Sequence, residues 1–117
     1  MFAGVKQPSV RGCGDWTSAV AGIGRWITSV NSCAVFGHPG YRMGFAWATQ
    51  PGTNTRICVE GQGYTTGSNG QTVRKWYSLG CGTSGGGTVP VGNRIVNPTV
   101  RAKTQLGFLG GLYRWKH

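Results

Sequence analysis

The chain has 117 residues, of which 12 are Lys or Arg and only two are acidic, so its formal net charge is +10. This length suits one small domain and argues against a second one. Because Asp15 and Glu60 are the only acidic side chains, the composition excludes a calcium or magnesium cage of several carboxylates. It also leaves a single carboxylate pair for any hydrolase of the two-carboxylate type.

The first twelve residues predict a segment distinct from the rest of the chain. Residues 1–12 contain Pro8 and show no clear hydrophobic period, so we expect an extended N-terminal arm. We find no sequence repeat and no linker in the remainder, and residues 13–117 are therefore predicted to form one β domain held by disulfides.

Apolar residues after the arm recur at helical spacing. They are Trp16, Val20, Ile23 and Ile27, and Asp15 precedes them as an N-cap candidate. This pattern predicts one short helix near residues 15–24, although the glycines within it disfavour helix. From residue 25 to residue 36 the β-branched and aromatic content favours a strand.

The middle of the chain alternates clearly. Residues 42–49 place Met43, Phe45 and Trp47 on one face, a turn covers residues 50–54, and residues 55–60 form a returning strand. Residues 61–72 are predicted to be a polar loop and residues 73–79 the next strand.

The C-terminal third predicts three more strands. The glycine tract 82–87 is expected to be a flexible turn, and residues 88–96, which contain Pro90, suit an edge strand. Residues 99–104 and 108–115 follow as strands. Short strands at this spacing with glycine turns indicate a small antiparallel β-sandwich or barrel.

Four cysteines stand far apart at Cys13, Cys33, Cys58 and Cys81. Without a close pair they do not predict a metal site, and two disulfides are expected instead. Sequence allows three connectivities, of which local order favours Cys13–Cys33 and Cys58–Cys81. A hairpin folded about residues 68 and 69 would bring Cys58 within one diagonal step of Cys81. Disulfides predict a secreted protein, and no apolar run is long enough for a membrane span.

Basic and aromatic residues are neighbours at several places, which predicts a binding surface for another protein or for a polyanion such as nucleic acid or an anionic cell surface. Alternation along half-buried strands would produce the same neighbours. The candidate binding residues are Arg25, Trp26, Arg42, Arg74, Lys75, Trp76 and Arg114.

The sequence offers few residues for acid–base catalysis. Glu60, His38 and His117 could act with an arginine as in small secreted ribonucleases, but no motif joins them. His38 and Glu60 are therefore kept as catalytic candidates for a less favoured hypothesis, and no cofactor or metal is expected.

Several strings in the C-terminal half carry a resemblance: ICVEGQGY (57–64), WYSLGCG (76–82), VPVGN (89–93) and VRAKT (100–104). With the cysteine placement, they resemble small secreted actinobacterial proteins with two disulfides, and are similar to the small hub subunits of umbrella toxin particles. The resemblance implies a non-enzymatic connector between a lectin-bearing subunit and a toxin stalk. Residues 1–12 would then suit insertion into a partner by strand addition.

Three hypotheses therefore follow from the sequence. The first is a secreted, non-enzymatic module that binds another protein, as an adaptor or hub in an antibacterial toxin assembly. The second is a free-standing cationic antimicrobial or cell-surface-binding protein. The third is a small secreted ribonuclease-like toxin that uses His38 and Glu60.

Overall fold

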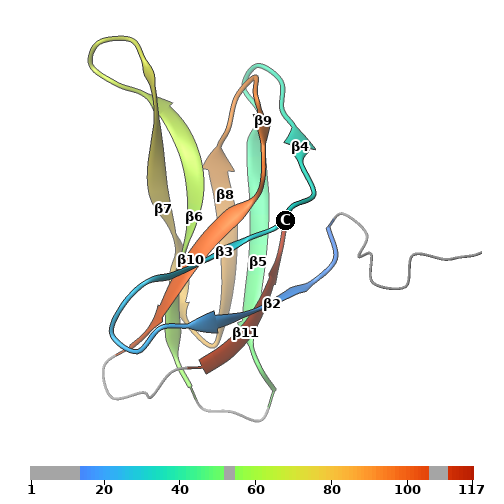
Figure 1. Cartoon of the computed structure of the whole chain (residues 1–117), viewed down its shortest axis with the longest axis vertical. Helices are drawn as coiled ribbons and strands as arrows, with labels where there is room; N and C mark the ends of the chain where they lie inside the picture. The colour runs from blue at the N-terminus through green and yellow to red at the C-terminus, as the bar shows by residue number, and fades with distance from the viewer. Residues whose placement is uncertain (1–13, 52–54, 106–110) are drawn as a thin grey trace, which may run out of the picture.

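The computed structural model describes residues 14–51, 55–105 and 111–117. In these ranges the chain is mainly β and contains no helix (Figure 1), which confirms the predicted β class. Along the chain the strands are β2 (Thr17–Ala21), β3 (Ile27–Val30), β4 (Val35–Phe36), β5 (Arg42–Thr49), β6 (Ile57–Thr66), β7 (Thr72–Gly82), β8 (Ser84–Pro90), β9 (Ile95–Val96), β10 (Thr99–Thr104) and β11 (Gly111–Lys116).

The described strands pair antiparallel in three sheets. One four-stranded sheet has the order β3-β10-β6-β7, a second has the order β2-β11-β5-β8, and β4 pairs with β9. The two larger sheets are joined at one corner, where Gly22 follows β2. Its N–H donates to the carbonyl of Ala102 and its own carbonyl accepts from the N–H of Thr104. Distant parts of the chain thus become neighbours.

One hydrophobic core is built from buried side chains of both larger sheets. As predicted, Met43, Phe45 and Trp47 of β5 are buried, and so are Ile57 and Val59 of β6. The same period-2 alternation that identifies these strands in the sequence decides which side chains point inward. Burial of this apolar face is the main source of stability for a domain of this size.

Two buried tryptophans tie the sheets together through their indole N–H groups. Trp47 on β5 donates to the carbonyl oxygen of Leu79 on β7 at 2.8 Å. Trp115 on β11 donates to the hydroxyl of Ser29 on β3 at 2.9 Å. Each hydrogen bond crosses from one sheet to the other, so both rings fill core volume without an unpaired polar atom.

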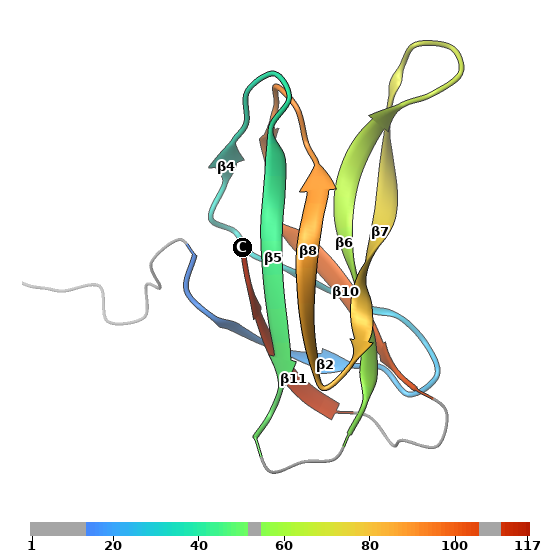
Figure 2. The ribbon, with the colours of Figure 1, turned by 180° about the vertical axis from the view of Figure 1, so that it is seen from behind.

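The hairpin of β6 and β7 is longer than the sequence predicts. Strand pairing continues to Thr66 opposite Thr72, so most of the predicted loop 61–72 is strand, and the β6–β7 loop extends beyond the neighbouring strands (Figure 1, Figure 2). Glycines at inward positions explain the error, because Gly61 and Gly63 are buried against the core. A side chain at Gly63 would collide with Tyr77 and Pro90.

A β-bulge in β7 sets the disulfide. The register shifts between Cys58 and Glu60, and Cys58 is then paired directly with Cys81. Gly80 accommodates the extra residue with a φ of 102°, in the left-handed region that favours glycine. The Cys58–Cys81 disulfide is present, which confirms this half of the predicted connectivity. Cys13 lies outside the described residues, so the Cys13–Cys33 pairing stays a prediction.

The predicted helix near residues 15–24 is wrong. Residues 17–21 form β2, which pairs with β11 from Thr17 opposite Trp115 to Ala21 opposite Gly111. Val20 is 48% exposed and Ile23 is 64% exposed, whereas Ala21 is buried. The apolar residues at helical spacing therefore do not share one buried face, and pairing with a strand far along the chain overrides the local pattern.

The glycine tract is also not a turn, since residues 84–90 form strand β8 at the edge of its sheet, next to β5. Close packing against β5 and against Leu79 excludes side chains at two of its glycines. A Cβ at Gly85 would lie 2.7 Å from the Leu79 carbonyl and 3.0 Å from the Trp47 ring, and one at Gly86 would collide with the Phe45 carbonyl. Pairing with β5 makes the tract a strand, and the close approach of the Trp47 ring and of neighbouring backbone leaves no room for side chains at Gly85 and Gly86.

The remaining strand predictions are confirmed in part. Residues 99–104 form β10 as expected, whereas residues 25–36 are divided between β3 and β4. The predicted edge strand over residues 88–96 is likewise divided between β8 and β9. The predicted strand 108–115 corresponds to β11, and its first residues lie outside the described ranges, as do residues 1–12.

Candidate binding surface

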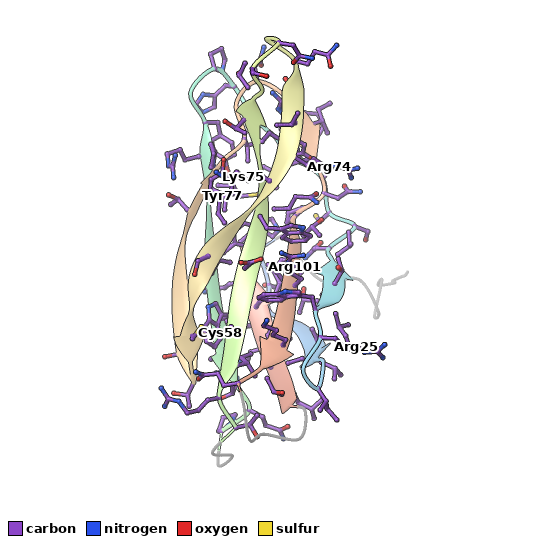
Figure 3. The ribbon with its side chains drawn as sticks, turned by 90° about the vertical axis from the view of Figure 1, so that its left-hand side faces the viewer. Arg25, Cys58, Arg74, Lys75, Tyr77 and Arg101 are labelled. Carbon is purple, nitrogen blue, oxygen red and sulfur yellow. A yellow bond between two sulfur atoms is a disulfide. The ribbon has the colours of Figure 1, made fainter. Side chains whose placement is uncertain are left out.

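The outward face of the sheet β3-β10-β6-β7 centres on Arg101. On β10, Val100 and Ala102 point into the core, so Arg101 points outward. Register places it directly opposite Glu60 of β6. Its Nε and Nη2 atoms both donate to Oε1 of Glu60, at 2.8 and 2.6 Å, and Figure 3 shows Arg101 in the middle of this face.

Two tryptophans complete the group around this guanidinium. Its Cζ atom lies 4.5 Å from the ring centroid of Trp26 and 4.5 Å from that of Trp76. Lys103, two residues along β10, places its Nζ 4.8 Å from the centroid of Trp26. We call these five residues, Trp26, Glu60, Trp76, Arg101 and Lys103, the Arg101 cluster. Cation–π contacts of this kind hold rings and charges in fixed positions.

The Arg101–Glu60 pair at the centre of the cluster is half-buried, and this burial determines its role in the surface. The side chains of Arg101 and Glu60 are 26% and 24% exposed. Partial burial strengthens their attraction relative to an exposed pair and fixes both side chains. Arg101 therefore organises the face, and the exposed cations around it are the groups free to meet a partner.

A smaller group of the same kind lies on the other large sheet. Trp16, just before β2, has the guanidinium carbon of Arg114 at 4.8 Å and the Nζ of Lys116 at 4.9 Å from its ring centroid. Arg114 and Lys116 alternate with the buried Tyr113 and Trp115 on β11. Each large sheet thus presents its own outward pairing of cations with tryptophan.

The predicted binding residues do not form one surface. Trp26 and Trp76 meet at Arg101, and Arg74 lies two residues before Trp76, on the same face of β7. Lys75 points to the opposite side, as Figure 3 shows, and its Nζ is 5.3 Å from the ring of Tyr77. The other predicted cations lie in the β2–β3 connection, at the start of β5 and on β11: Arg25, Arg42 and Arg114.

The acid–base candidates have different neighbours. Glu60 is held by Arg101. His38 lies in the exposed connection before β5, with its Nδ1 3.1 Å from the Pro39 carbonyl oxygen and its ring 5.1 Å from that of Tyr41. His117 follows β11, in the other large sheet, and burial lowers the pKa of its imidazole.

Sequence reasoning missed Arg101 and Lys103 as site residues. The alternation of residues 99–104 could have indicated them, because it puts both cations on one outward face. What the sequence lacked was the order of strands, which places β10 between the strand that follows Trp26 and the strand that carries Glu60.

We compared the chain with protein-family models, curated proteins and solved structures, and none of them matches it. None of the described residues belongs to a helix able to cross a membrane. Within ranges 14–51, 55–105 and 111–117, no three His, Cys, Asp or Glu side chains gather as metal ligands would.

Proposed function

We propose that the protein is a secreted, non-enzymatic module that binds another protein, and that it serves as an adaptor or hub in an antibacterial toxin assembly. In this proposal the two large sheets form a β-sandwich, stapled by Cys58–Cys81 and by Cys13–Cys33. The recognition surface is the outward face of the sheet β3-β10-β6-β7.

The observation that carries the proposal is the Arg101 cluster. Its rings and charges are held by one another, with Arg101 donating two hydrogen bonds to Glu60. A rigid array loses little side-chain entropy when a partner covers it, and Arg and Trp are the residues that contribute most to protein interfaces. The same ion pair occupies the carboxylate that a ribonuclease-like site would need as its base, which favours binding over catalysis.

Affinity purification of a tagged form from the culture supernatant of the producing organism tests the proposed protein binding. We expect a stoichiometric partner protein to be retained by the wild type and lost from R74A/K103A, which removes two cations from the outward face of β3-β10-β6-β7. The matched control is R114A/K116A, which removes two cations from the other large sheet and should keep the partner.

Other outcomes would support the alternative hypotheses. Equal losses in both double variants, together with elution by moderate salt, would indicate general attraction to polyanions. Killing of bacteria by the isolated protein would support the free-standing antimicrobial hypothesis. RNA degradation that disappears in His38→Ala would support the ribonuclease hypothesis.

The N-terminal arm gives a separate test of the adaptor proposal. Residues 1–12 lie outside the described residues, and insertion of this arm as an added strand stays a proposal. A chain lacking residues 1–12 should lose the partner if the arm is inserted. Unchanged retention would exclude arm insertion while leaving the sheet face as the recognition surface.

A further inference from the structure

A second feature lies away from the Arg101 cluster, where the start of β5 meets the ends of β6 and β8 at the top of Figure 2. These segments and the β8–β9 connection line an open pocket of about 360 Å³. The N–H groups of Val91 and Gly92 both donate to the Tyr41 carbonyl oxygen at 3.0 Å, which ties the β8–β9 connection to the residue before β5. Arg42, Arg94, Tyr41 and Tyr64 are among the lining residues.

Both arginines are held in place by neutral groups. The Nε of Arg42 donates to the Thr88 hydroxyl at 3.0 Å, and its Nη2 to the Thr88 carbonyl at 3.3 Å. The Nε of Arg94 donates to the Val91 carbonyl at 2.6 Å, and its Cζ lies 4.8 Å from the Tyr64 ring centroid. Fixing a guanidinium in this way lowers the entropy lost when it binds a ligand.

Among the described residues that line the pocket, no acidic side chain compensates these two charges. The only acidic side chains are Asp15 and Glu60, neither lines the pocket, and Glu60 is bound to Arg101. Two guanidinium groups held by neutral partners, in a pocket that Tyr41 and Tyr64 also line, form a site prepared for an oxyanion, since Arg presents a planar fork of donors to carboxylate or phosphate.

We propose that this pocket binds the carboxylate of an Asp or Glu side chain presented by an extended segment of the protein partner. Protein is favoured over nucleic acid because the aromatic rings that would stack on bases are already engaged by the chain's own cations. Examples are Trp26 with Lys103 and Tyr64 with Arg94. The inference rests on the proposed function only in assigning the carboxylate to a protein.

A peptide titration of the full chain tests the pocket. The probe is a capped five-residue peptide of alternating glycine and glutamate, followed by amide chemical shifts at low salt. We expect the largest shifts at the pocket residues, and R42Q should weaken the apparent affinity about tenfold because a charge-assisted hydrogen bond is lost. The glutamine version of the peptide should not bind.

Matched variants keep the test specific. Arg56 is an exposed guanidinium that donates to the neutral side chain of Gln105 and does not line the pocket, so R56Q removes the same charge and should change affinity less than twofold. R94K keeps the charge at the second position but loses the planar fork, and should weaken binding severalfold. Equal effects of R42Q and R56Q would overturn the proposal.

Two further results would also overturn it. Inorganic phosphate that shifts the same amides with higher affinity than the peptide would assign the pocket to phosphate instead of carboxylate. If both R42Q and R94K bind the peptide with full affinity, the peptide does not bind in this pocket. The titration needs no native partner, so its failure is distinguishable from loss of the partner in R74A/K103A.

Discussion

Two pairs of tryptophans in this small domain have opposite environments. Trp47 and Trp115 are 2% and 0% exposed, and each donates its N–H to an acceptor in the facing sheet. Trp26 and Trp76 lie on the outward face of one sheet, where both rings contact Arg101. The inner pair holds the two sheets together, whereas the outer pair positions a charge on the surface.

The contrast shows that the number of tryptophans does not by itself predict a binding surface or a core. The inner rings stabilise the fold through buried area and through hydrogen bonds that leave no unpaired polar atom. The outer rings are available for recognition only as parts of a fixed group with Arg101. Substitutions should therefore affect stability at the inner pair and binding at the outer pair.

The largest expected effect is at the inner pair. Trp47→Ala should lower the free energy of unfolding by about 3–5 kcal/mol, because it removes a buried ring and leaves a cavity. Trp26→Ala is the matched control and should cost about 1 kcal/mol, because it removes only the half-buried cation–π contacts with Arg101 and Lys103. Urea unfolding followed by far-UV circular dichroism measures both. Similar losses in the two variants would contradict the division between inner and outer tryptophans.

A smaller effect is expected at Arg101. Arg101→Ala removes the ion pair with Glu60 and the contacts with two rings, and should cost about 1–2 kcal/mol because the pair is only half-buried. Arg56→Ala, at an exposed guanidinium, should stay within about 0.5 kcal/mol of wild type. The same urea experiment reports the difference. If both variants unfold alike, the outer tryptophans do not form a cooperative group.

The smallest expected change is at the buried phenol of Tyr113, which packs in the core with the inner tryptophans. Its hydroxyl has no hydrogen-bond partner among the described residues, and burial raises its pKa above the ordinary 10.0. As the pH rises, the phenol therefore loses its proton in the unfolded chain before it does so in the folded chain. Its contribution to the free energy of unfolding is complete below pH 10 and is lost as the pH rises further.

The variant Tyr113→Phe tests this pH dependence, because it removes the phenol hydroxyl. It should raise the free energy of unfolding by about 1 kcal/mol at neutral pH, because an unpaired buried hydroxyl is removed. It should also flatten the loss of stability above pH 10. Unfolding of Tyr113→Phe and of Tyr77→Phe, a half-buried control, across pH 7–11 measures this. Parallel profiles for the two variants would exclude Tyr113 as the titrating group.

The sequence by itself determined the strands that alternate. Met43, Phe45 and Trp47 were identifiable as a buried face, and the spacing of residues 58–81 was enough to suggest the disulfide. These features are local or lie within one hairpin, so period-2 patterning and loop length carry the information.

Only the tertiary structure decided the rest. Residues 17–21 form a strand because β11, almost a hundred residues later, pairs with them, and the glycine tract is a strand because residues 84–90 pair with β5. Arg101 became a site residue when β10 was placed next to β6, opposite Glu60. Such contacts depend on strand order, which is fixed by the burial of the whole core and is not encoded in any short segment.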